Sequence, residues 1–217
     1  MDRLWFHLGR VVHRLSYKVG PRLMSELRKR WVLLRHPRAN IVFRGPVYLG
    51  PGFSLHIPAN GTFIAGAGTE FRRNFRAEVA GDGRLVVGEG CSFTYDVLIQ
   101  CSTTVEFGDR CGVGQSCFVA DGKHNYRDHT RPFQQQGYDF RPIRIGDDVM
   151  ILSKVTIVAD VGDHCVIGAN AVVNRDVPAY CVAAGVPAKV RDYFGPPGGE
   201  PPELAASGAE RTEPASA

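Results

Sequence analysis

The feature that most constrains the fold of this chain is a six-residue repeat that occupies its middle. An apolar residue returns at the first position and a small residue at the fifth, as in Val87-Gly-Glu-Gly-Cys91, Phe107-Gly-Asp-Arg-Cys111 and Val161-Gly-Asp-His-Cys165. A short strand of this kind cannot bury its apolar residue in an isolated hairpin, so the chain must coil and stack its own turns. We therefore predict a triangular prism in which about three repeats close one coil and successive coils pair as parallel strands.

The repeat begins loosely at Ile41 and becomes sharp from Val87 to Val119 and again from Ile145 to Val177. The first position should point into the prism, where burial of one Ile or Val side chain contributes about 1.5–3 kcal/mol. The fifth position should lie near a corner and must be small. Cysteine fills it at Cys91, Cys111, Cys117 and Cys165. We therefore expect buried free thiols, as in a cytosolic protein, rather than disulfides.

The sequence divides into a basic amphipathic helical arm at residues 1–38, a repeat domain at residues 39–192 and a disordered tail at residues 193–217. The tail is rich in Pro, Gly, Ala and Glu and cannot offset the entropy cost of ordering. Residues 1–40 contain ten Lys or Arg against Asp2 and Glu26, which gives +8, so the remaining residues carry −4 of the total of +4. The main body therefore has no nucleic-acid-binding footprint.

The arm is expected to form two helices, separated at Gly20-Pro21. Each has an apolar set at helical spacing: Leu4, Leu8, Val11, Val12 and Leu15 in the first, and Leu23, Met24, Leu27, Trp31 and Leu34 in the second. Two compatible roles are open. The arm can cap the exposed end of the prism, or it can lie on an anionic membrane surface with Trp5, Phe6 and Trp31 at its margins. We expect neither a signal peptide nor a membrane-spanning segment.

A polar segment at residues 120–144 interrupts the repeat and carries His124. Repeat folds tolerate insertions on their binding face, and a loop of this length in a compact domain is usually functional or disordered. The position of the loop between two runs of the repeat therefore makes His124 the leading candidate for a chemical role.

Three motifs, DGKHNY followed by QG, IGDDV and NRDVPAYCVAAGVPAKV, carry a resemblance that covers roughly residues 85 to 191. They resemble the hexapeptide-repeat acyltransferases with a left-handed parallel β-helix fold, and within them the sugar and polysaccharide O-acetyltransferase branch. The resemblance implies an all-β, left-handed parallel β-helix that assembles as a homotrimer. It also implies transfer of an acetyl group from acetyl-CoA to a hydroxyl of a sugar or polysaccharide precursor.

In this family a loop histidine takes a proton from the acceptor hydroxyl, and His124 matches it. An imidazole suits this step because it titrates near neutral pH, and such base catalysis contributes about 10²–10⁴ in rate. Asp121 is a candidate for orienting the ring, and His129 is a rival for the role of base. The acceptor site is expected to include three polar residues: Thr94, Asp96 and Gln136.

The resemblance places CoA along a groove between neighbouring subunits and implies no metal. The positions that match its lining are Ser153, Ala169, Asn174, Arg175 and Lys189. Small residues let the pantetheine arm approach the backbone, while cations, with Arg191 as a further candidate, can meet the phosphates. The chain departs from the family's pattern at Met150 and Leu152, which replace the usual tryptophan and glycine, and at the run Ile157–Gly162, which is two residues short. Leu152 could narrow the groove.

Two alternative hypotheses stay open. The γ-class carbonic anhydrases share the prism and bind zinc through three histidines, but Gly88 stands where one of these ligands is expected. A non-catalytic trimeric scaffold would result if Leu152 blocked the groove. The expected location is the cytoplasm, with peripheral contact at the inner membrane face if the arm binds lipid.

Overall fold

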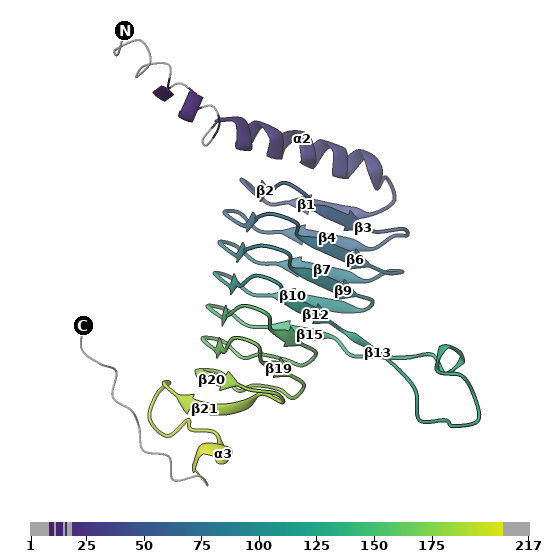
Figure 1. The fold of residues 1–217 in the computed structure, drawn as a ribbon, viewed down its shortest axis with the longest axis vertical. Coiled ribbons are helices and arrows are strands. Elements are labelled where there is room, and N and C mark those ends of the chain that lie inside the picture. The colour runs from purple at the N-terminus through teal and green to yellow at the C-terminus, as the bar shows by residue number, and fades with distance from the viewer. Residues whose placement is uncertain (1–8, 11, 15, 17–18, 206–217) are drawn as a thin grey trace.

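The computed structural model describes residues 9–10, 12–14, 16 and 19–205, and its main body is a prism of parallel strands (Figure 1). Its faces are three sheets, here named A, B and C, which the chain visits in that order in each coil. Sheet A contains β1 (Asn40–Phe43), β4 (Thr62–Ala65), β7 (Arg84–Val87), β10 (Thr104–Phe107) and β15 (Ile143–Ile145). Sheet B contains β2 (Tyr48–Leu49), β5 (Glu70–Phe71), β8 (Ser92–Phe93), β11 (Gly112–Val113), β16 (Met150–Ile151), β18 (Val166–Ile167), β20 (Cys181–Ala184) and β21 (Lys189–Tyr193). Sheet C contains β3 (Ser54–His56), β6 (Arg76–Val79), β9 (Leu98–Cys101), β12 (Phe118–Ala120), β17 (Thr156–Ile157) and β19 (Val172–Val173).

The interior of the prism is apolar along its length, as the first position of the repeat predicted. Toward the N-terminal end it is filled by phenylalanines, and the ring centroids of Phe71 and Phe75 lie 4.5 Å apart. Toward the C-terminal end β-branched residues take over, and Ile145, Ile157 and Ile167 are fully buried. The stacked coils therefore share one continuous core.

Successive coils become shorter along the chain, and this shortening accompanies the change from phenylalanine to isoleucine. Thr62 pairs with Arg84, 22 positions later. After the loop, Ile151 pairs with Ile167, only 16 positions later, and the next coil has the same length. The short run Ile157–Gly162 therefore tightens one corner, as the sequence predicted.

The fifth position of the repeat lies at the corners, beside left-handed turns. Cys111 follows Arg110, whose φ is 58°, and its thiol lies 3.0 Å from the carbonyl oxygen of Gly146 in the next coil. All six cysteines are described, buried and free, so the prediction of free thiols is confirmed. Burial raises the pKa of the Cys117 thiol, which keeps it protonated and unreactive.

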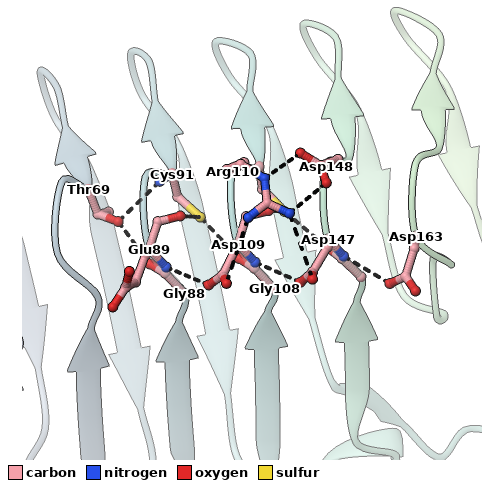
Figure 2. Close-up of polar contacts among 12 residues, drawn as sticks. Thr69, Gly88, Glu89, Cys91, Gly108, Asp109, Arg110, Asp147, Asp148 and Asp163 are labelled. Atoms are coloured by element: carbon pink, nitrogen blue, oxygen red, sulfur yellow. Dashed lines mark hydrogen bonds and ion pairs between the residues drawn. The ribbon is translucent and has the colours of Figure 1, made fainter.

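A row of carboxylates closes the corner between sheets A and B, hereafter the A–B corner (Figure 2). Each carboxylate accepts the backbone N–H of the matching residue in the preceding coil. The bonds run from Glu89 to Asp109 at 2.7 Å, from Asp109 to Asp147 at 2.8 Å and from Asp147 to Asp163 at 2.9 Å. Arg110 adds a bidentate ion pair with Asp148, with two N–O distances of 2.7 Å. The aspartates of the repeat therefore hold neighbouring coils together.

Helix α2 (Gly20–Arg35) lies across the end of the prism formed by the first coil (Figure 1). The Ser25 hydroxyl accepts the N–H of Leu49 at 2.8 Å, and Arg28 donates to the carbonyl oxygen of Leu49 at 3.0 Å. These bonds give α2 the capping role that was one of the two predicted for the arm. Trp5, Phe6 and most of the first apolar set lie outside the described residues.

At the other end of the prism the chain turns back on itself. Strand β21 pairs antiparallel with β20, Pro201 is buried, and the short helix α3 (Pro202–Ala205) contacts β21. The Tyr193 hydroxyl donates to the carbonyl oxygen of Pro196 at 3.0 Å. The predicted tail boundary at residue 193 is therefore too early, because these contacts hold the chain as far as Ala205. In the described part of the chain, no helix combines the length and apolar character needed to cross a membrane.

Candidate active site

The insertion leaves the prism between sheets C and A, hereafter the C–A corner, after β12 and returns at β15. Its base is an antiparallel pair of strands, β13 (Gly122–His124) and β14 (Tyr138–Phe140), and its tip contains the 3-10 helix η2 (Phe133–Gln135). The insertion projects away from the prism (Figure 1). His124, the last residue of β13, is thus carried outward from the core.

The His124 side chain is exposed and lies among aromatic rings. Its ring centroid is 4.2 Å from that of Tyr138 and 5.3 Å from that of Phe133. Tyr138 stacks in turn on Phe140, and a Cβ atom at Gly122 would lie only 2.6 Å from the Phe140 ring. The aromatic neighbours therefore restrict the imidazole while leaving it open to solvent. The roles of Phe133, Tyr138 and Gly122 were not predicted.

The Gln136 side chain holds the tip of the loop together. Its amide nitrogen donates to the carbonyl oxygens of Asp128 and Arg131, both at 2.8 Å, and its amide oxygen accepts the N–H of Asp128 at 3.0 Å. The structure thus gives Gln136 a role in loop packing, and its contact with the acceptor stays a prediction. His129, the rival base, is exposed on the same tip.

The Asp121 side chain forms its hydrogen bonds within the C–A corner and not with His124. Its buried carboxylate accepts the backbone N–H of Ser102 at 2.8 Å and that of Thr103 at 2.6 Å. The suggestion that Asp121 orients the His124 ring is therefore wrong, because its oxygens are bonded to the preceding coil.

Arg141, which was not predicted as a site residue, anchors the returning end of the loop. Its guanidinium lies 3.0 Å from Asp160 and 2.8 Å from Asp176, which occupy the C–A corner in successive coils. Asp160 also accepts the N–H of Arg144 at 2.8 Å, as the aspartates of the A–B corner do. The hydrogen bond from Arg141 lowers the pKa of the Asp176 carboxyl. The spacing of Asp160 and Asp176 by one coil is the sequence signal that could have identified this anchor.

A second group of predicted residues lies at the corner between sheets B and C, hereafter the B–C corner. Thr94 and Asp96 follow β8, Ser153 follows β16 and Ala169 follows β18. Backbone hydrogen bonds connect the turns of successive coils at this corner. Lys189 begins β21 beside β20 at the C-terminal end of the same edge. The structure therefore places these five residues along one edge of the prism.

The acceptor residues on this edge already have partners within the fold. The Thr94 hydroxyl donates to the carbonyl oxygen of Val113 at 3.1 Å, and Asp96 accepts from the Asn74 amide at 2.9 Å. Asp96 is nevertheless exposed, so its carboxylate is accessible to a ligand.

Asn174 and Arg175 lie on the other edge, because they follow β19 at the C–A corner. A full face of the prism separates the two edges. The extended path from Ser116 to Asp121 through β12 covers about 16 Å at roughly 3.3 Å per residue. Within one chain the predicted site is thus divided, with the histidine loop on one edge and Thr94 on the other.

The two substituted positions of the family's pattern, Met150 and Leu152, lie beside the B–C corner. Met150 and Leu152 are 52% and 40% exposed. A Cβ atom at Gly114, one coil earlier, would lie 2.6 Å from the carbonyl carbon of Leu152, so the backbones are in close contact and the Leu152 side chain points outward. A groove along this edge is therefore narrower at Leu152 than it would be beside glycine.

Metal chemistry has no candidate centre among the residues that the structure describes. They contain no group of three or more His, Cys, Asp or Glu side chains placed to hold an ion.

Comparisons with known proteins identify the family to which this prism with its histidine loop belongs. Residues 142–175 match the bacterial transferase hexapeptide family (six repeats). Galactoside O-acetyltransferase of Escherichia coli is 31% identical over 182 residues, which cover 81% of this chain and 74% of that protein. The chain belongs to the hexapeptide-repeat acyltransferase family.

A further relative is longer than this chain. The protein named "Probable acetyltransferase Rv3034c" from Mycobacterium tuberculosis is 34% identical over 167 residues, which cover 74% of this chain but 55% of the relative. Among solved structures, a galactoside acetyltransferase in complex with coenzyme A matches with a TM-score of 0.54 at 23% identity, over 79% of this chain and 72% of that one. This likeness concerns the fold, and the predicted left-handed parallel β-helix is confirmed.

Proposed function

We propose that this protein is an O-acetyltransferase that moves an acetyl group from acetyl-CoA to a hydroxyl of a sugar or polysaccharide precursor. The observation that carries the proposal is the exposed His124 imidazole, held by aromatic rings on a loop that leaves a corner of the prism. The galactoside O-acetyltransferase relative supports a sugar hydroxyl as acceptor. The solved galactoside acetyltransferase in complex with coenzyme A supports the donor.

His124 is the general base of the proposed reaction. Its unprotonated nitrogen accepts the proton of the acceptor hydroxyl while the hydroxyl oxygen bonds to the thioester carbonyl carbon. The carbon–sulfur bond breaks, and the imidazolium returns the proton to the departing sulfur. The products are an acetyl ester and the free thiol of CoA, so atoms and charge balance without a metal.

The B–C edge is the proposed binding surface for both substrates. Ser153 and Ala169 are small and leave room for the pantetheine arm, and Lys189 is exposed where it can meet a phosphate. Thr94 and Asp96 lie further along the same edge and are proposed to hold the acceptor hydroxyl. Leu152 lies between the donor-binding and acceptor-binding parts of this edge and limits the width of the donor path.

We propose a homotrimer because the site is divided between two edges of each chain. In a closed cyclic assembly the C–A edge of one copy can face the B–C edge of the next. His124, Asn174 and Arg175 of one copy would then complete the site that Ser153 and Ala169 of its neighbour begin. The projection of the loop away from its own prism supports this arrangement (Figure 1).

The remaining parts of the proposal concern organisation and location. Residues 39–192 form the catalytic unit, with residues 120–144 as its active-site loop. A position in the cytoplasm with peripheral contact at the inner membrane face suits the charge of +8 on residues 1–40.

The experiment that tests the proposal combines CoA titration with an acceptor screen. Calorimetry should detect CoA binding, and thiol release from acetyl-CoA should rise when sugar or glycan acceptors are added. The second candidate, a scaffold whose donor path is closed by the exposed Leu152, predicts neither heat nor thiol release. If CoA binds only after Leu152→Gly, the scaffold is favoured over the enzyme.

A further inference from the structure

Helix α2 attaches to the prism by its polar side. The residues buried against the prism are Ser25, Lys29 and Val32, and the Lys29 ammonium lies 5.9 Å from the Phe43 ring centroid. The mainly polar face of an amphipathic helix is normally the one that meets water. In α2 this arrangement is reversed.

The opposite side of α2 carries an exposed apolar stripe. Its members are Leu23, Leu27, Trp31 and Leu34, with exposed fractions of 60%, 48%, 60% and 73%. Their spacing of four, four and three residues places them on one helical face. That face points away from the prism because Ser25, Lys29 and Val32, on the opposite face, are the residues buried against it. In the described part of the chain, nothing is seen to cover these side chains.

Positive charge borders the stripe. Arg30 lies on one side of it and Arg35 on the other, and both are exposed. The acidic residue of the helix, Glu26, is bound by Lys29 at 2.7 Å and does not offset them. Residues 19–40 contain six Lys or Arg against this one Glu, which gives +5. The surface is therefore apolar at its centre and basic at its edges.

We propose that this face of α2 docks on an anionic lipid bilayer. An interfacial helix of this kind buries Leu and Trp side chains among the acyl chains, while Arg side chains meet anionic headgroups. A second copy of the chain is the weaker occupant, because pairing two such faces would bring Arg30 and Arg35 of both copies together. Capping and lipid contact thus belong to opposite faces of one helix.

The docked orientation bears on the acceptor, in a step that rests on the proposed function. A groove of about 1640 Å³ leads from α2 toward the B–C corner, where Tyr95 lines it. Its charged lining residues are Arg14, Arg22, Arg72 and Arg73 against Glu26 and Glu70. Glu26 is paired with Lys29 and Glu70 lies 3.4 Å from Arg72, so the groove keeps a positive excess. Tyr95, which lines the groove, directly precedes Asp96, the predicted acceptor residue. An acceptor joined to a lipid through phosphate fits this path, because its phosphate would meet the arginines while its lipid stays in the bilayer.

The trimer would strengthen the attachment. Copies that meet along their edges stand side by side, so their α2 helices face the same way. Three weak contacts on one surface give an avidity well above that of a single helix.

The proposal is tested by co-sedimentation of the full chain with vesicles of phosphatidylcholine alone and of phosphatidylcholine mixed with phosphatidylglycerol. The chain should bind the anionic vesicles, more weakly at high salt, and should leave neutral ones largely unbound. Leu27→Glu should weaken binding about tenfold or more, since it places a charge in the exposed stripe that the bilayer would bury. The matched control is Leu33→Glu, at a residue 46% exposed against 48% for Leu27 but away from the stripe. Its binding should fall by no more than about threefold, because the two variants differ only in position on the helix.

Three results would overturn the proposal. The first is equal binding to neutral and anionic vesicles, and the second is an equal loss in Leu27→Glu and Leu33→Glu with both variants folded by circular dichroism. The third is self-association of the lipid-free chain that Leu27→Glu abolishes while vesicle binding is absent, which would make a second copy the occupant. Acetyl transfer to a water-soluble acceptor, measured without vesicles, tests the enzyme separately, so either proposal can fail without the other.

Discussion

The A–B and C–A corners of the prism use the same bond for different purposes. In each, an aspartate accepts a backbone N–H from the preceding coil, as Asp147 does at the A–B corner and Asp160 at the C–A corner. At the A–B corner the row is continuous and its arginine, Arg110, pairs with Asp148 in the next coil. At the C–A corner a long loop enters the row, and Arg141 fastens its end to Asp160 and Asp176.

The difference shows how a repeat fold acquires a site. The A–B corner connects only coils, so changes there should affect stability. The C–A corner also connects the coils to the loop that carries His124, so changes there should affect chemistry as well. Four predictions test this division, beginning with the largest effect.

His124→Ala should reduce kcat by about 10²-fold or more, because the acceptor hydroxyl loses its proton acceptor. CoA binding, measured by calorimetry, should stay unchanged, since the proposed donor edge belongs to the B–C corner. His129→Ala is the matched control on the same loop and should stay within about threefold of the unmodified chain. A larger loss in His129→Ala than in His124→Ala would transfer the role of base to His129.

Arg141→Gln should reduce kcat by about tenfold, because the end of the loop loses its bonds to Asp160 and Asp176 and the imidazole is less well positioned. Arg110→Gln, which breaks the corresponding ion pair at the A–B corner, should leave the rate unchanged. Steady-state kinetics on the two variants gives the comparison. Equal rate losses would show that the corners do not differ in function.

Asp147→Ala should lower the free energy of unfolding by about 1 kcal/mol, because the N–H of Asp109 loses its acceptor. Turnover at saturating substrate should not change. Denaturant unfolding measures the first quantity, and Asp82→Ala, at an exposed carboxylate away from the row, is the control. If Asp147→Ala left the free energy of unfolding unchanged, water would have replaced the carboxylate as the acceptor.

The smallest expected effect is on the loss of folding stability at acid pH. The hydrogen bond from Arg110 lowers the pKa of the Asp148 carboxyl below its ordinary value of 3.8. A carboxylate with a lowered pKa stabilises the fold above that ordinary value, and this contribution disappears as the pH falls through the folded pKa. Stability from this pair should thus be level near neutral pH and fall below about pH 4. In thermal melts across this range, Asp148→Asn should make the melting temperature depend less on pH. An unaltered dependence would contradict the contribution assigned to the Arg110–Asp148 pair.

The repeat was enough to predict the prism, its apolar interior and the buried cysteines, because a six-residue period has one way to bury Val87, Phe107 and Val161. It could not predict that α2 would meet the prism through Ser25 and Lys29. Helical periodicity shows which residues share a face but not which face is covered.

The site was predictable in its residue types and less so in its arrangement. His124 stands out because the loop that carries it interrupts the repeat. Tyr138 and Phe133 reach it only through the pairing of β13 with β14. Asp121 looked like a partner for the histidine because it is near in sequence. Its bonds to Ser102 and Thr103 depend on the stacking of coils, which spacing along the chain does not reveal.

The most direct test of a site shared between copies is complementation between two inactive variants. His124→Ala removes the base from the C–A edge, and Ala169→Trp would obstruct the donor path on the B–C edge. Unfolded and refolded together in equal amounts, they should regain about one quarter of the original activity, because each interface in a closed ring draws its two edges from independent copies. A mixture no more active than the separate variants would contradict a site built from two chains.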